Sequence, residues 1–186
     1  MALKFIPNTY AFRWFADNRP EPIAADGLAN TDVAPTLATN DNILRLRAMI
    51  YNSGTTGSTA VLTAQYSTDG STFVAMGSSN HWNYANGQAV DGNTCAGPTF
   101  FVYGATFGKY HESASISETW VVGTRLEFDF ALQATATVLG SQLYTFRFLI
   151  AGVAITPTVG KANPTLTTAA TASSMIHFMP IISTPV

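Results

Sequence analysis

Charged side chains are scarce in this chain. Asp, Glu, Lys and Arg make up 11% of its 186 residues, whereas about a quarter of an average soluble domain is charged. The surface must therefore be covered largely by hydroxyl, amide and small side chains. Such a surface is common on oligomeric and particle-bound proteins, and it also fits an ordinary β domain with a quiet exterior.

Basic clusters are missing as well. The three Lys and six Arg residues are scattered, and the formal net charge is −2. A protein that binds nucleic acid through its phosphates needs a basic run or stripe. The sequence therefore predicts no nucleic-acid partner.

Cysteine, long apolar runs and a secretory leader are also lacking. Cys95 is the only cysteine, which excludes an intrachain disulfide framework and a cysteine-based zinc site. It lies in a turn-rich loop, so we expect a small buried or idle thiol. No stretch reaches the ~18 apolar residues that span a bilayer, and the N-terminus lacks the apolar core of a signal peptide. We expect no membrane partner and synthesis in a cytoplasm.

Patterns that carry catalysis or bind cofactors are absent. No nucleophile elbow, phosphate-binding loop or dinucleotide fingerprint occurs. Glu112 and Glu118 could pair for acid–base chemistry on a glycan, but they flank a Ser-rich stretch and are expected to be solvated carboxylates. None of the histidines has a second ligand at metal-binding spacing; these are His81, His111 and His177. The sequence predicts no enzyme, no metal and no cofactor.

Alternation with a period of two is the clearest pattern that is present. It marks residues 43–51, 61–66, 73–76, 125–133 and 144–151 as half-buried antiparallel strands. Asp69-Gly70 supplies the positive-φ turn of a hairpin between two of them. No window keeps the stripe of an amphipathic helix. We expect seven to nine strands in all.

The alternation also assigns faces to the strands. In residues 43–51, Leu44 and Leu46 point to an apolar face, while Arg45 and Arg47 are expected on a mostly wet one. In residues 125–133, phenylalanine and leucine alternate with Glu and Asp in the same way. The sequence therefore predicts one core face and one solvent face for each strand.

These strands and turns predict an all-β fold, an antiparallel β-sandwich of immunoglobulin-like or jelly-roll type. We expect a single domain with extended N- and C-terminal segments. Residues 1–42 hold the N-terminal segment and first strand, residues 43–155 the sandwich body, and residues 156–186 a linker and C-terminal strand or arm. Two stretches, 16–42 and 77–115, are interpreted as long connections, which are usually functional or interface-forming.

The last eleven residues are apolar and rich in strand formers. They follow a Thr, Ala and Ser run that contains Pro157 and Pro164, which favour extended backbone. Leaving such a tail in water would cost about 1.5–3 kcal/mol for each large side chain. We expect either a strand of the same domain or an arm buried in a neighbouring subunit.

Aromatic residues gather in the second long connection. Trp82, Tyr84 and Tyr103 lie beside Asn and Gln and could stack on sugar rings. They could instead cap the core or pack against a neighbouring subunit, where aromatic residues are enriched. We favour packing.

Several of these stretches resemble virion-associated β-sandwich proteins. The residues that carry the resemblance are 5–14 (FIPNTYAFRW), the pair Asp17-Asn18, residues 44–54 (LRLRAMIYNSG) and the hairpin 62–74. The resemblance covers roughly residues 3–75 and 125–150. It is to proteins of tailed bacteriophages, in which small β-rich decoration, or cement, proteins sit on the capsid exterior as trimers or dimers.

The resemblance implies a structural virion protein on the capsid exterior, made in the host cytoplasm. It would bind the major capsid protein, stabilise contacts between capsid subunits and form a homo-oligomer, most simply a homotrimer. The expected interface residues are Phe5, Ile6, Tyr10, Trp14, Trp82, Tyr84, Phe101, Tyr103, Ile176, Phe178, Met179, Ile181 and Ile182. The alternatives are a glycan-binding module of a tail fibre or surface filament, and a filament subunit that donates its terminal strand to the next copy.

Overall fold

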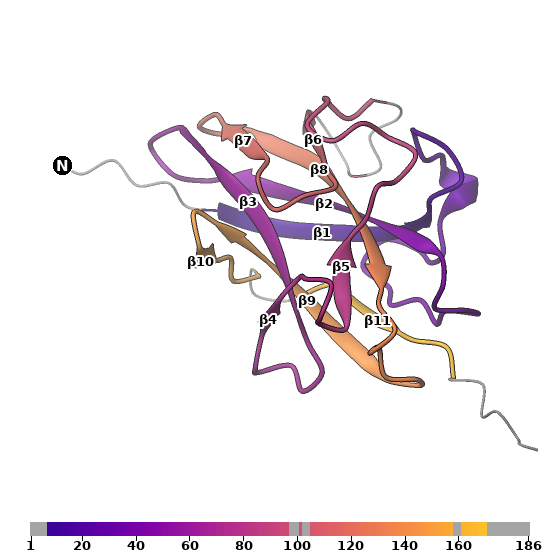
Figure 1. The fold of residues 1–186 in the computed structure, drawn as a ribbon. Helices are drawn as coiled ribbons and strands as arrows, with labels where there is room; N and C mark the ends of the chain where they lie inside the picture. The colour runs from indigo at the N-terminus through magenta and orange to yellow at the C-terminus, as the bar shows by residue number, and fades with distance from the viewer. Residues whose placement is uncertain (1–6, 97–100, 102–104, 158–160, 171–186) are drawn as a thin grey trace, which may run out of the picture.

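The computed structural model describes residues 7–96, 101, 105–157 and 161–170. Within these residues the chain forms strands and no α-helix; the one helical element is a short 3-10 turn, η1 (Ala24–Asp26). The strands make two sheets that pack face to face (Figure 1). The predicted all-β sandwich is confirmed.

Sheet A is built around two long central strands. Its order is β1-β2-β8-β5, and β6 also pairs with β8. All pairs are antiparallel except β6 with β8, which is parallel. The bounds are β1 (Pro7–Ala16), β2 (Ile43–Asn52), β5 (Trp82–Tyr84), β6 (Ala105–His111) and β8 (Arg125–Ala134).

Sheet B is built around β3 and β9, in the order β10-β9-β3-β4. β11 also pairs with β9, and β7 with β3, and every pair is antiparallel. The bounds are β3 (Ser58–Ser67), β4 (Val74–Ala75), β7 (Ser117–Trp120), β9 (Leu143–Ile150), β10 (Val153–Ala154) and β11 (Thr165–Thr167).

The core lies between the sheets and uses the apolar sets that the alternation predicts. Leu46 of β2, Phe130 of β8 and Phe148 of β9 are all buried in one cluster. The rings of Phe130 and Phe148 stack across the two sheets, with centroids 5.3 Å apart. Gly70, at the tip of the β3–β4 hairpin, has φ +74°, which confirms the positive-φ turn expected there.

The prediction of a wet outer face is wrong for sheet A. Arg45, Arg47, Glu127 and Asp129 are all buried on the side of the sheet that faces away from the core. The reason is that the two long connections fold over this side. We call the segments that do so, residues 17–32 and 86–96, the covering segments.

The covering segments are tied to the sheet by hydrogen bonds. The Arg45 guanidinium donates to the carbonyl of Pro20 (2.8 Å), and Arg47 donates to the carbonyl of Ala96 (3.3 Å). Beside them, Phe101 completes a small apolar cluster with Ala11 and Met49 on the same face. Sheet A is therefore buried on both sides.

Three strands fall where the sequence predicts only connections. β5 and β6 lie in the stretch 77–115, and β11 lies in the Thr-rich run and pairs with β9. These strands are too short, or too polar, to show alternation. Their positions are fixed by neighbouring strands that are distant in sequence.

The edge of sheet A along the second half of β1 is closed by the chain itself. The amide of Phe12 donates to Asp32 Oδ1 (3.0 Å), and the amide of Leu28 donates to the carbonyl of Trp14 (2.9 Å). A strand donated by another copy would have to displace this segment, since its hydrogen-bonding groups are already used.

The edge of sheet B along β3 is closed in three places. β7 covers its start and β4 its end. Between them, the amide of Ala64 donates to the hydroxyl of Tyr84 (2.8 Å), which reaches across from sheet A. The opposite edge, along β9, carries β10 and β11.

Candidate functional site

The largest group of buried charged side chains in the described residues lies on the outer side of sheet A. We call it the ionic layer, and it consists of Arg45, Arg47, Glu127 and Asp129. Arg45 Nε lies 3.0 Å from Asp129 Oδ1. Arg47 Nε lies 3.4 Å from Glu127 Oε1 and 3.5 Å from Asp129 Oδ2. Two positive and two negative groups balance one another. Such balance is required because an uncompensated buried charge is strongly destabilising.

Arg45 connects this layer to the first covering segment. Besides Asp129, it contacts Asp17 Oδ1 at 3.4 Å and stacks over the ring of Tyr110 at 4.8 Å. Burial alone would lower the pKa of the Arg45 guanidinium, but the carboxylates of Asp129 and Asp17 raise it above its ordinary value. The guanidinium therefore stays charged and holds the first covering segment against sheet A.

Cys95 lies in the second covering segment and is buried beside this layer. Burial, together with the negative charge of Asp129, raises the pKa of its thiol far above the ordinary value. A reactive cysteine needs the opposite shift. The thiol is therefore protonated, and it is buried, as expected from the sequence.

Glu112 and Glu118, which are close together in the sequence, have separate hydrogen-bond partners. Glu118 is 2% exposed, so the prediction of a solvated carboxylate is wrong for this residue. Its Oε1 lies 2.8 Å from His111 Nε2 and accepts the amide of Lys109. Since His111 lies on β6 of sheet A and Glu118 on β7, this contact joins the two sheets.

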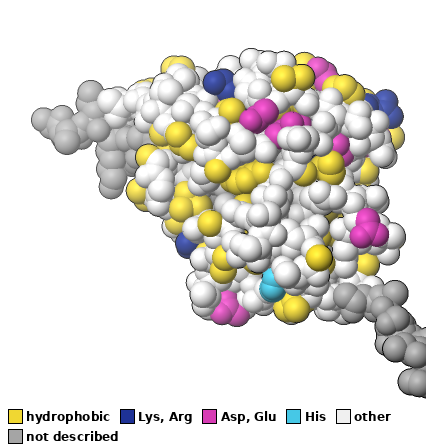
Figure 2. All heavy atoms as spheres, in the orientation of Figure 1, with side chains coloured by type: hydrophobic (Ala, Val, Ile, Leu, Met, Phe, Trp, Pro, Cys, Tyr) yellow, Lys and Arg dark blue, Asp and Glu magenta, His cyan; other side chains and the backbone are white. Residues whose placement is uncertain are grey.

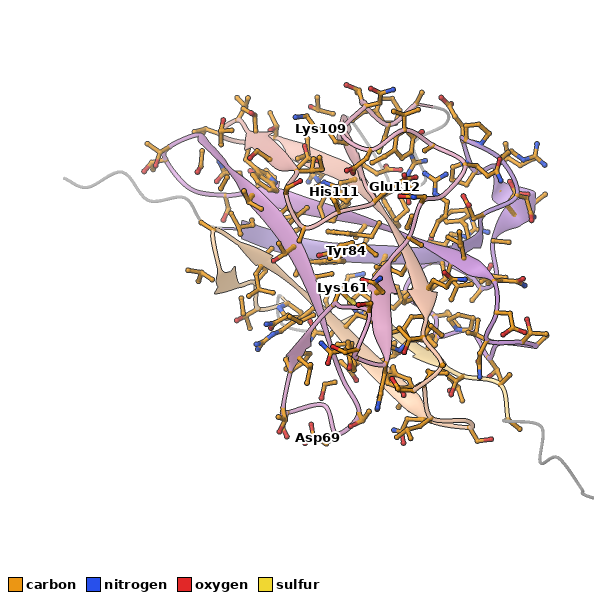
Figure 3. The ribbon with its side chains drawn as sticks, in the orientation of Figure 1. Asp69, Tyr84, Lys109, His111, Glu112 and Lys161 are labelled. Carbon is orange, nitrogen blue, oxygen red and sulfur yellow. The ribbon has the colours of Figure 1, made fainter. Side chains whose placement is uncertain are left out.

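Glu112 differs from Glu118 in its exposure and in its hydrogen-bond partner. It is only half-buried, and its Oε1 accepts the amide of Gly87 at 2.8 Å. Burial raises the pKa of this carboxyl. His111 and Glu112 are labelled in Figure 3, above Tyr84. The hydrogen bonds of Glu112 and Glu118 fix a loop and a strand, respectively, and they do not form an acid–base pair.

Three expected interface residues are buried within their own chain, and a fourth, Tyr84, is partly buried. Trp14 and Trp82 are both 0% exposed, and both pack edge-on against Phe146. Phe101 is buried on sheet A, and Tyr84 is partly buried and packs against the core. Because Trp14, Trp82 and Phe101 are buried within their own chain, their side chains cannot also contact a neighbour in this conformation, and Trp82 cannot stack on a sugar.

The remaining expected interface residues lie outside the described part of the chain. For Tyr10 only the backbone is described, within β1. Those outside altogether are Phe5, Ile6, Tyr103, Ile176, Phe178, Met179, Ile181 and Ile182.

The outer side of sheet B differs from that of sheet A because neither covering segment lies on it. We call this surface the open face. It carries partly or fully exposed side chains, mostly threonine and aliphatic: Thr59, Val61, Thr63 and Gln65 on β3, Leu143, Thr145 and Arg147 on β9, and Thr165 and Thr167 on β11.

One charged side chain lies among these strand residues of the open face, and it is restrained. Arg147 donates to Gln65 Oε1 (2.8 Å) and stacks on the ring of Phe73, 4.0 Å from its centroid. Figure 2 shows how few acidic and basic side chains reach the surface in that view. Burial of the open face would thus require little desolvation of charge.

No cluster of three or more potential metal ligands occurs in the described residues. Among them, no helix is long and apolar enough to cross a membrane. The chain matches no family model, no curated protein and no solved structure in three comparisons. The candidate functional surface therefore depends on the geometry alone.

Proposed function

We propose that this chain is a structural virion protein, a capsid decoration protein that binds the head exterior and stabilises contacts between major capsid subunits. The observation that carries the proposal is the difference between the two sides of the sandwich. On the outer side of sheet A, the charged side chains pair with one another beneath the covering segments. The open face of sheet B is nearly uncharged and accessible.

The ionisable groups support a structural role. The ionic layer fixes both covering segments, and the contact between His111 and Glu118 fixes β6 against β7. A molecule restrained in this way loses little conformational freedom when it binds, and lost freedom is a main cost of association. Rigidity of this kind suits a protein whose task is to hold other subunits in place.

The open face is the surface that we assign to the capsid. Standard interfaces bury about 800 Å² on each partner, and several copies linked in a homotrimer would bind with avidity. The threonine and aliphatic side chains supply hydroxyl groups and apolar area without charges that must be desolvated. The mechanism is additive burial, with no chemical step.

Introducing a charge on the open face tests this proposal. Val61→Glu places a carboxylate on the open face, and Val90→Glu places one on a covering segment; both valines are exposed, at 37% and 63%. Purified variants would be sedimented with capsids assembled without this protein. We expect Val61→Glu to weaken binding about tenfold or more and Val90→Glu to bind like wild type. Equal binding by both variants would overturn the assignment of the open face.

A further inference from the structure

A surface pocket of about 420 Å³ lies at one end of the sandwich. It is formed by the β3–β4 hairpin, the turn before β5 and the turn after β8. The lining includes Asp69, Thr72, Val74, Asn80, His81 and Thr137. The volume falls within the range of pockets that hold small molecules, about 300–1,000 Å³. In Figure 3 the label of Asp69 marks this end of the molecule.

The hydrogen bonds around Tyr144 fix the tautomer of His81. The Tyr144 hydroxyl accepts the amide of Leu139 (2.9 Å) and lies 2.9 Å from His81 Nδ1. Because Tyr144 is fully buried, its hydroxyl hydrogen needs an acceptor, and Nδ1 is the acceptor within reach. Neutral His81 therefore carries its hydrogen on Nε2. That N–H has no hydrogen-bond partner in the described part of the chain.

Asp69 contributes a fixed, ionised acceptor. Its Oδ1 accepts the amides of Ser71 (2.8 Å) and Thr72 (2.7 Å), and the hydroxyl of Ser67 (2.8 Å). These bonds, led by the amide of Thr72, lower the pKa of the Asp69 carboxyl well below its ordinary value. The hydroxyl of Thr72 also interacts with this carboxylate; apart from that contact, its second oxygen, Oδ2, has no hydrogen-bond partner among the described residues.

Asn80 contributes a second acceptor in a fixed orientation. Its amide nitrogen donates to the carbonyl of Ala75 (2.9 Å), and its own backbone carbonyl accepts the hydroxyl of Thr135. With the nitrogen engaged, the side-chain oxygen is left as an acceptor. The pocket thus offers one N–H donor, two acceptor oxygens and neighbouring hydroxyl groups.

We propose that this pocket binds a neutral saccharide unit. Adjacent sugar hydroxyls both donate and accept, so they match the His81 donor and the Asp69 and Asn80 acceptors. The exposed side chain of Val74 offers an apolar contact for the C–H face of a sugar ring. No Lys or Arg lines the pocket, which disfavours an anion, and a single carboxylate supplies too few oxygens for a calcium site.

This inference goes beyond the capsid-binding role and does not depend on it. It also places glycan recognition away from Trp82, which is buried in the core, and from Tyr84, which is partly buried against it. A decoration protein with such a pocket would present a sugar-binding surface on the particle, separate from the open face.

Ligand-detected NMR on the full chain, without capsids, tests the proposal. The probes are the methyl glycosides of glucose, galactose, mannose and N-acetylglucosamine, each measured with and without EDTA. We expect millimolar binding of at least one glycoside, unchanged by EDTA. Binding of none of them, or binding that EDTA abolishes, would overturn the proposal.

A matched pair of variants locates the binding. Asp69→Asn keeps the oxygen that accepts the turn amides and replaces the second oxygen with a donor. Asp41→Asn makes the same change of charge at an exposed site outside this pocket. We expect Asp69→Asn to weaken binding about tenfold or more and Asp41→Asn to leave it unchanged; equal effects would overturn the proposal. Nitrogen-15 NMR of His81 provides a check without ligand, because a hydrogen on Nδ1 would contradict the assigned donor.

Discussion

Single residues in this protein connect parts of the fold that are far apart in sequence. The indole nitrogen of Trp14 donates to the carbonyl of Thr165 (2.9 Å), which joins β1 to the strand β11 near the end of the described chain. The hydroxyl of Tyr84, on sheet A, connects the two sheets by accepting the amide of Ala64 on β3. Burial raises the pKa of Tyr84 to about 12, so its hydroxyl remains neutral and remains an acceptor for Ala64.

Removing the Tyr84 hydroxyl tests the closure of the β3 edge. In Tyr84→Phe the amide of Ala64 loses its acceptor, and a buried unpaired amide costs about 1–3 kcal/mol. The control is Tyr51→Phe, which removes a hydroxyl that makes no described hydrogen bond and keeps the ring that stacks with Arg125. Denaturant unfolding of both variants gives the comparison. An equal loss of stability in the two variants would show that the edge bond contributes nothing.

At the scale of the element, alternation was sufficient to predict three of the long strands. Residues 43–51, 125–133 and 144–151 agree with β2, β8 and β9 to within a residue or two. The pattern failed for β5 and β11, three residues each, because so short a strand shows no period. It also failed on the outer side of sheet A, since alternation marks a polar face but cannot show what covers it.

One sequence signal could have revealed the covered face. Two arginines repeat at alternate positions in β2, and two acids repeat on the same side of β8, in a chain with only nine basic and eleven acidic residues. Opposite charges on neighbouring strands of such a chain indicate internal pairing. The pocket at the β3–β4 hairpin has no comparable signal, because its groups come from three separate turns.

The reactivity of Cys95 tests whether the covering segments are fixed by the ionic layer. In the native protein we expect slow modification by a thiol reagent, because the thiol is buried and its pKa is raised. Asp129→Asn leaves Arg45 and Arg47 poorly compensated, which should cost about 3–5 kcal/mol and speed the modification. Asp41→Asn is the control. If Asp129→Asn reacts as slowly as wild type and is equally stable, the layer does not hold the segments.

At the scale of the whole molecule, the strands of both described sheets come from residues that precede the last sixteen. Every strand from β1 to β11 lies before residue 171, and the core residues that the structure describes belong to these strands and the segments between them. The apolar C-terminal segment, which the sequence predicts as a strand or arm, lies outside the described residues.

Truncation after Ala172 separates folding from assembly. We expect the shortened chain to keep the circular dichroism of a β protein, since all described strands remain. Sedimentation equilibrium should show a homotrimer for the full chain and a smaller species for the truncated one. Unfolding of the truncated chain would make the C-terminal segment part of the core, and an unchanged trimer would place the subunit contacts elsewhere.

The central claim is that this protein coats the outside of a virion, and its copy number tests that most directly. Quantitative mass spectrometry of purified particles would measure the ratio of this chain to the major capsid protein. A decoration protein predicts a ratio near one. A ratio corresponding to a few copies per particle, or absence from the particle, would contradict the account.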